Sequence, residues 1–182
     1  MSGPRAPVPS SRPVSKAFTK DDASDAPLVV PARAPLPSGV ANYVTPRGLA
    51  LLREELALLR ADRARFELRS HDADGPRDLA IATARLAELD DRLACAQLVE
   101  APESPGTQGE ARFGATLTVR ADAGGERTYQ IVGVDEADVA HGRIAFVAPL
   151  ARALLGKRVG DVVTLRTPRG DDELEVIAIA YV

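Results

Sequence analysis

Two runs of regularly spaced apolar residues, separated by one short turn, constrain this chain more than any other feature. In the first run the steps are three, four and three residues, followed by a longer step that skips Arg63. The second run repeats the three-and-four spacing. The apolar residues are Leu49, Leu52, Leu56, Leu59 and Phe66 in the first run, and Leu79, Ala82, Leu86, Leu89, Leu93 and Ala96 in the second. This spacing is typical of the contact stripe of a coiled-coil helix, so the leucines are expected to be structural.

The turn between the two runs fixes their relative direction. Residues 71–76 read His-Asp-Ala-Asp-Gly-Pro, and adjacent Gly and Pro are strong turn residues. Two helices joined by so short a connection must run antiparallel. The sequence therefore predicts an antiparallel coiled-coil helical hairpin over residues 43–100, with Arg63 interrupting its apolar stripe and loosening its end.

The start of the first helix is marked by three neighbouring residues. Thr45 is a natural N-cap, because its hydroxyl can accept from a free backbone N–H of the first turn. Pro46 suits the first helical position, and Val44 can pack on Leu49 across the cap. The first helix is therefore expected to begin at Pro46.

The chain on either side of the hairpin has a different character. Residues 1–42 are rich in proline and lack periodic apolar residues, which predicts a disordered tail. Residues 101–110 read as a linker. In residues 111–182 the apolar period changes to two, which predicts about five strands and one short helix near 149–155. The fold class is therefore α+β, a hairpin followed by a small β-rich domain.

Composition excludes several classes of protein. The net charge of −3 gives no basic surface for tight binding to nucleic acid, so any such role is expected to be indirect. A single cysteine, Cys95, excludes an internal disulfide and a cysteine-rich metal site. No apolar run is long enough to cross a membrane, and a cytoplasmic protein is expected.

Four segments, in this order, resemble the GreA/GreB family of transcription elongation factors. They are residues 43–56 (YVTPRGLALLREEL), 85–99 (RLAELDDRLACAQLV), 113–119 with 128–138 (FGATLTV and TYQIVGVDEAD), and 149–157 with 159–163 and 167–170 (PLARALLGK, VGDVV and TPRG). The resemblance covers about residues 43–182 and implies an FKBP-like C-terminal domain. It also implies a partner, core RNA polymerase, which the factor binds as a monomer at the secondary channel with the hairpin pointing inward. Acidic side chains at the hairpin tip would then help the polymerase to hold a second Mg²⁺ during transcript cleavage.

The tip departs from the family pattern. The family motif Gly-Asp-Leu-x-Glu-Asn-Ala is absent, and against the flanking segments the hairpin is about fourteen residues shorter, which withdraws its tip by roughly 10 Å. Because carboxylate–metal bonds are about 2 Å long, weak or no stimulation of cleavage is expected. The turn keeps Asp72 and Asp74, with Asp78 just after it. These form a relocated acidic tip that reaches Mg²⁺, or they are ordinary turn and helix-start residues.

Two further groups of candidate residues follow from the resemblance. A basic face on the first helix either meets RNA or polymerase, or is a solvated face balanced by Asp62 and Glu67. A docking surface on the C-terminal domain is expected to contact the channel rim, where Phe146 serves as an exposed anchor or as a core residue. The basic candidates are Arg60, Arg63, Arg65 and Arg69, and the docking candidates are Asp135, Glu136, Phe146, Pro149 and Arg152.

Two other classes of function were compared with an accessory factor. An FKBP-like domain raises the possibility of prolyl isomerase activity, but 4% aromatic residues and no Trp argue against an aromatic pocket. No nucleophile–base pair is visible, so the protein is expected to have no catalytic residues, metal site or cofactor of its own. A non-catalytic coiled-coil scaffold is the remaining alternative.

Overall fold

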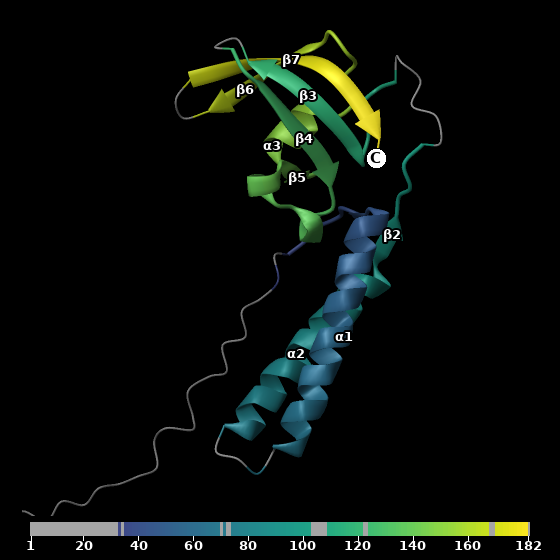
Figure 1. The fold of residues 1–182 in the computed structure, drawn as a ribbon, viewed down its shortest axis with the longest axis vertical. Coiled ribbons are helices and arrows are strands. Elements are labelled where there is room, and N and C mark those ends of the chain that lie inside the picture. Colours follow the sequence, from purple (N-terminus) through teal and green to yellow (C-terminus); the bar gives the residue numbers. More distant parts are fainter. Residues whose placement is uncertain are drawn as a thin grey trace, which may run out of the picture.

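The structure, a computed structural model, describes residues 33, 35–69, 71, 74–102, 109–121, 124–167 and 170–181. A long two-helix arm projects from a compact β-rich head (Figure 1). The predicted α+β class, a helical hairpin followed by a small β-rich domain, is confirmed. None of the described helices is long and apolar enough to span a membrane.

The arm consists of α1, Pro46–Leu68, and α2, Gly75–Ala94. The predicted start of α1 is confirmed, since the Thr45 hydroxyl accepts a hydrogen bond from Gly48 N at 2.9 Å. Gly75 and Pro76 do not lie in the turn, as the sequence suggested, but form the first turn of α2. A proline loses nothing there, because the N–H it lacks would have no partner inside the helix.

The predicted stripes of apolar residues hold the two helices together. Val44, Leu52 and Leu89 are buried at the centre of the arm's core, and residues of both stripes pack around them. Those surrounding residues are Leu49, Leu56, Leu59, Leu93 and Ala96. Ala96 belongs to a short strand after α2 rather than to the helix. Arg63 does not interrupt this core, because its side chain is 48% exposed and pairs with Glu67.

A pair of three-residue strands ties the two ends of the arm together. β1, Asn42–Val44, precedes α1, and β2, Ala96–Leu98, follows α2; they pair in parallel. The side chain of Asn42 donates to Arg92 O at 2.9 Å, which satisfies a carbonyl at the end of α2. The sequence analysis missed both strands, because three residues are too few to show a period of two.

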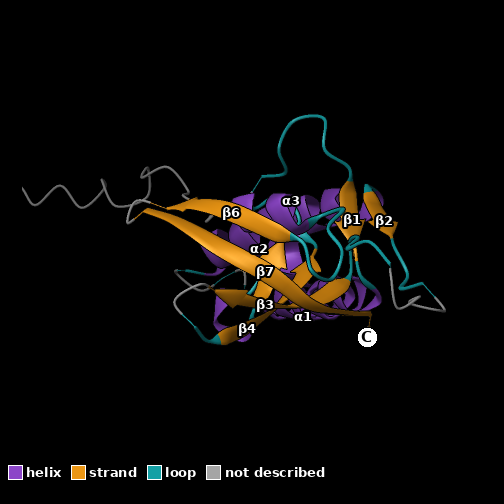
Figure 2. Cartoon of the chain, turned by 90° about the horizontal axis from the view of Figure 1, so that it is seen from above, coloured by secondary structure: helices purple, strands orange, loops and turns teal. Residues whose placement is uncertain are grey.

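The head is built on a five-stranded sheet in the order β5-β4-β3-β7-β6. Figure 2 shows β4, β3, β7 and β6 side by side in this order. Neighbouring strands are antiparallel except for β4 and β5, which are parallel. The strands are β3, Ala115–Ala121; β4, Glu126–Val132; β5, Arg143–Ala145; β6, Val162–Thr167; and β7, Gly170–Tyr181. Alternation along β3 buries Ala115, Leu117 and Val119 on one face.

One short helix completes the core of the head. α3, Pro149–Leu154, places Ala151 and Leu154 against the buried residues of the sheet. Two 3-10 turns, η1 at Val134–Glu136 and η2 at Val139–His141, connect β4 to β5. The first of these turns faces the arm and contacts α1.

Described residues of the predicted tail make contacts before the expected boundary at residue 43. Residues 1–32 and 34 of the predicted tail lie outside the described residues, as do 103–108 of the predicted linker. Arg33 forms two ion pairs, and Asn42 is a buried strand residue. The proline-rich composition did not predict the contacts of Arg33, because they are made with residues more than twenty positions away in the sequence.

Candidate functional site: the arm and its junction with the head

A buried carboxylate from the head fixes the start of the arm. The Glu136 side chain, on η1, is 1% exposed. It accepts hydrogen bonds from the Thr45 hydroxyl and from Arg47 Nη1, the latter at 2.9 Å. The Thr45 hydroxyl therefore caps α1 and also binds Glu136 of the head. These two hydrogen bonds fix the first turn of the arm against the head.

Two glycines allow this close approach. A Cβ on Gly48 would lie 2.8 Å from Glu136 Oε2, and a Cβ on Gly133 would lie 2.7 Å from the backbone oxygen of Tyr43. Both distances are shorter than real Cβ atoms show. Glycine at these two positions lets the arm lie directly against the head.

The neighbouring acid on η1 binds the other helix of the arm. The Asp135 side chain is 8% exposed, and its Oδ2 lies 3.4 Å from Nε of Arg92, near the end of α2. Its Oδ1 accepts from Arg33 Nη1 at 2.9 Å. Adjacent carboxylates of one turn therefore contact the base of both helices.

Three aromatic rings form the apolar part of the junction. Tyr43 of β1 lies 5.8 Å from Phe113 and 5.6 Å from Phe146, measured between ring centroids. Phe113 and Phe146 are also 5.6 Å apart and meet edge to face. Such pairs stabilise a contact beyond the burial of their area. Phe146 therefore packs within the protein, at the junction, rather than standing free as an anchor.

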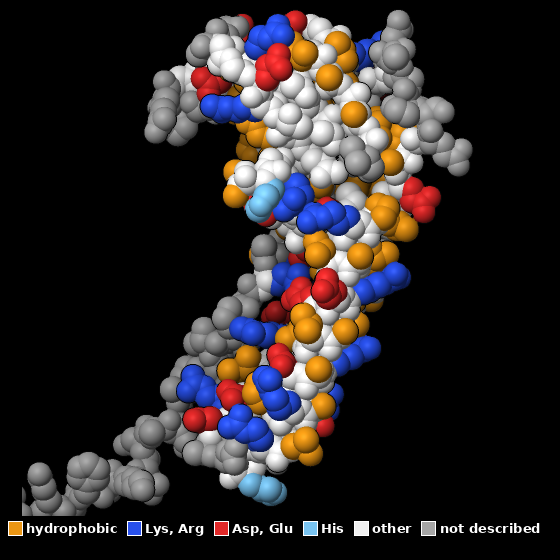
Figure 3. All heavy atoms as spheres, in the orientation of Figure 1, with side chains coloured by type: hydrophobic (Ala, Val, Ile, Leu, Met, Phe, Trp, Pro, Cys, Tyr) orange, Lys and Arg blue, Asp and Glu red, His pale blue; other side chains and the backbone are white. Residues whose placement is uncertain are grey.

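The predicted basic face lies on the distal half of the arm, where it alternates with acids (Figure 3). Arg60 lies 3.7 Å from Asp90 of α2, Arg63 lies 2.8 Å from Glu67, and Arg65 lies 3.0 Å from Asp62. Arg65 also stacks over the Phe66 ring at 5.3 Å. Arg69 is exposed at the end of α1. These arginines share one part of the arm, and Arg60, Arg63 and Arg65 have acidic partners among its described residues.

The structure describes two of the three acidic tip candidates, and they differ in exposure. Asp74 is exposed just before α2, and its side chain makes no capping hydrogen bond. Asp78 is half-buried in the first turn of α2, where a carboxylate favours the helix dipole. Asp72 lies outside the described residues. Within the described ranges, no group of three His, Cys, Asp or Glu side chains could hold a metal ion.

The remaining docking candidates lie on the surface of the head. Pro149 and Arg152 are exposed on α3, and Arg152 Nε donates to Val147 O at 2.7 Å. On η2, Val139 is 81% exposed. Beside it, Asp138 Oδ2 lies 2.6 Å from His141 Nδ1 and accepts from Arg143 at 2.7 Å. The hydrogen bond from His141, with the charges of both neighbours, holds the pKa of Asp138 below its ordinary value.

Comparison with known proteins identifies the family. The family model described as transcription elongation factor, GreA/GreB, C-term, matches residues 106–181. The transcription elongation factor GreA of Alkalilimnicola ehrlichii is 38% identical over 153 residues, which cover 76% of this chain and 96% of that protein. The chain belongs to the GreA/GreB family. The resemblance expected from the sequence is thereby confirmed.

A GreB relative gives the same result. The transcription elongation factor GreB of Neisseria meningitidis serogroup B is 36% identical over 156 residues, covering 78% of this chain and 94% of that protein. Among solved structures, the GreA factor homolog Gfh1 of Thermus thermophilus is 25% identical, with a TM-score of 0.37 and coverage of 78% and 99% of the two chains. The family model and the names of the GreA and GreB relatives place this Gre-family chain in transcription elongation and its regulation.

Sequence reasoning missed the residues that join the arm to the head. Thr45 was predicted only as a cap, and Arg33 was placed in a tail without structure. Tyr43 and Phe113 stood at the starts of two segments that resemble the Gre family, but nothing in their spacing showed that they meet. One signal in the sequence could have indicated this junction. The two adjacent acids on η1, which were interpreted as docking residues, have opposite charges available in Arg47 and Arg92 at the base of the two helices.

Proposed function

We propose that this chain binds core RNA polymerase at the secondary channel and regulates elongation with weak or no stimulation of transcript cleavage. The head would dock at the channel rim and the arm would enter the channel, as the Gre-family resemblance implies. The observation that supports this proposal best is the projecting arm (Figure 1). Glu136, Asp135 and the aromatic contacts anchor this arm to the head. A rigid arm can carry a tip to a defined place in a partner.

The length of the arm supports weak cleavage. At 1.5 Å per residue, the 23 residues of α1 span about 34 Å. The match to the A. ehrlichii factor runs over 153 positions but takes up 76% of this chain, about 138 of its 182 residues, so about 15 positions of that relative have no counterpart here. If these positions belong to the hairpin, the tip stops roughly 10 Å short, beyond the reach of a carboxylate–metal bond of about 2 Å.

The exposure of Asp74 favours one alternative, a cleavage-stimulating factor with a relocated acidic tip. In that case Asp72 and Asp74 would share Mg²⁺ with the polymerase, and the factor would add ligands to an ion that it does not hold by itself. The chemistry would belong to the polymerase in either case. This chain would act as an accessory protein with no catalytic residues or cofactor of its own.

The docking surface that we propose is smaller than the sequence suggested. Asp135, Glu136 and Phe146 are engaged at the junction, so they would position the arm rather than contact the polymerase. The exposed Pro149, Arg152 and Val139 are left to meet the rim. An apolar contact flanked by charge is typical of protein interfaces.

The experiment that tests this proposal uses purified core polymerase, backtracked elongation complexes and a standard GreA. We expect this chain to bind polymerase in competition with GreA and to leave most backtracked RNA uncut. Robust cleavage that disappears in an Asp72→Ala, Asp74→Ala variant, but persists in an Asp91→Ala control at the base of α2, would establish the relocated tip instead. If neither binding nor competition is detected, the proposal is wrong and the scaffold alternative is favoured.

A further inference from the structure

A third element reaches the junction from the N-terminal side. Arg33 Nη1 donates to Asp135 Oδ1 of the head at 2.9 Å, and Arg33 Nη2 donates to Glu55 Oε1 of α1 at 2.5 Å. One side chain thus bridges the arm and the head. The planar guanidinium presents several N–H groups in fixed directions, so it can hold both carboxylates at once.

Burial makes the contact with Asp135 more important than an ordinary surface ion pair. The side chains of Asp135 and Arg33 are 8% and 21% exposed, whereas that of Glu55 is 46% exposed. Within the described part of the chain, Asp135 Oδ2 has no hydrogen-bond donor, although Nε of Arg92 lies 3.4 Å away. A carboxylate withdrawn from water needs such cations around it, because losing one leaves its charge poorly compensated.

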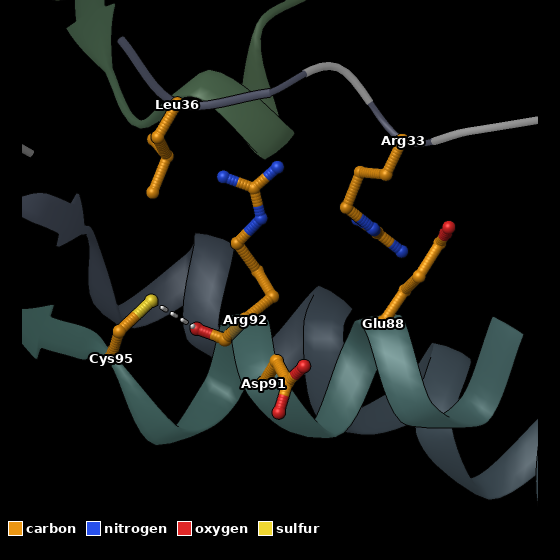
Figure 4. A pocket seen from close by; sticks show the side chains of 6 residues that line it. All are labelled: Arg33, Leu36, Glu88, Asp91, Arg92 and Cys95. Atoms are coloured by element: carbon orange, nitrogen blue, oxygen red, sulfur yellow. Dashed lines mark hydrogen bonds between the residues drawn. The ribbon is translucent and has the colours of Figure 1, made fainter. Parts of the chain in front are cut away.

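The segment that carries Arg33 crosses α2 without packing tightly on it. Figure 4 shows this segment above α2, with the side chains of Leu36 and Arg33 directed toward the helix. An open pocket of about 320 Å³ lies between this segment and α2, lined by Arg33, Leu36, Glu88, Asp91, Arg92 and Cys95. This N-terminal segment is therefore held to the arm more by the ionic contacts of Arg33 than by close packing.

We propose that Arg33 is a positioning residue, and that Arg33 and residues 35–40 form a strap which fixes the direction of the arm relative to the head. Because the arm is long, a small change of its direction at the base becomes a large displacement of its tip. With an arm of about 34 Å, a tilt of about 10° at the base moves the tip by about 6 Å. This role is a property of the chain by itself and does not depend on the proposed partner.

The test measures the arm's direction in the full-length chain. Spin labels are placed at Ala61→Cys on α1 and Val159→Cys on the head, both exposed, in a Cys95→Ser background. We expect Arg33→Ala to broaden the distance distribution and shift it by several ångströms. Arg33→Lys should give an intermediate width, because a single ammonium group cannot hold both carboxylates in the same geometry. Arg53→Ala, at an exposed arginine of α1, is the matched control and should leave the distribution unchanged.

The proposal is overturned if Arg33→Ala, and also the Arg33→Ala, Leu36→Ser double variant, keep the distribution of the parent. It is equally wrong if Arg53→Ala broadens the distribution as much. Circular dichroism of each variant checks that the helices are intact. If Arg33→Ala loses helix, the comparison of Arg33→Lys with Arg53→Ala decides the question.

Discussion

Replacing Gly48 by alanine should destabilise the protein when residue 136 is Glu and stabilise it when residue 136 is Ala. In an isolated helix Ala is favoured over Gly by about 0.5–1 kcal/mol. Here the added Cβ would lie 2.8 Å from Glu136 Oε2 and 3.4 Å from Thr45 Oγ1. The carboxylate must then move away from Thr45 and Arg47, which donate hydrogen bonds to it.

In the parent protein, the loss of hydrogen bonds to Glu136 should outweigh the gain in helix preference from the added methyl group. A hydrogen bond to a charged group contributes about 1.5–3 kcal/mol, and the half-exposed Arg47 can recover part of its loss from water. Setting this against the helix preference, we expect Gly48→Ala to lower the free energy of unfolding by about 1–2 kcal/mol. In a Glu136→Ala background the obstructing oxygen is absent, so the same substitution should stabilise by about 0.5–1 kcal/mol.

Urea unfolding of the four proteins in this cycle, followed by circular dichroism, measures both effects. Ala57→Gly, at an exposed position within α1, is the control that gives the helix preference without the contact. It should cost about 0.5–1 kcal/mol in both backgrounds. If Gly48→Ala destabilises the two backgrounds equally, the contact with Glu136 is not its cause and the reasoning fails.

Two further predictions concern the core of the arm and the surface of the head. Leu89 is fully buried between the helices, so Leu89→Ala should lower the free energy of unfolding in urea by about 2–5 kcal/mol. Leu58→Ala, at a residue 63% exposed, should lower it far less, and equal losses would contradict the assigned core. The pKa of Asp138 is held below its ordinary value of 3.8 chiefly by the hydrogen bond from His141, so its contribution to stability should be complete above that pH and lost as the pH falls through the lowered pKa. Carboxyl NMR titration should show the pKa of Asp138 rising in His141→Ala, and an unchanged titration would contradict this cause.

Much of the fold was predictable because it rests on local periodicity. The three-and-four spacing of leucines placed both helices, and Thr45 followed by Pro46 placed the start of α1. Alternation in β3 and β4 predicted their hairpin. Each of these signals comes from residues within a few positions of one another, where side-chain direction follows directly from the backbone.

The candidate site was predicted less well. Asp135, Glu136 and Phe146 were identified as important, but their partners Arg33, Thr45 and Tyr43 lie about 90 to 100 positions away. A carboxylate at the surface and one at a buried junction look the same in sequence. Arg63 shows the opposite case, because its place on the apolar stripe suggested a disturbed core, yet its long side chain reaches water and pairs with Glu67.

The sequence by itself determined that this chain forms a two-helix arm and a β-rich head, and that it belongs with the Gre factors, because these conclusions need only local spacing and matched segments. Only the tertiary structure decided which residues join the two parts and hold the arm in place. Two adjacent acids, three aromatic rings and one arginine ahead of the arm are brought together by contacts between distant segments. Those contacts depend on burial and on charge pairing in three dimensions, which no local pattern encodes.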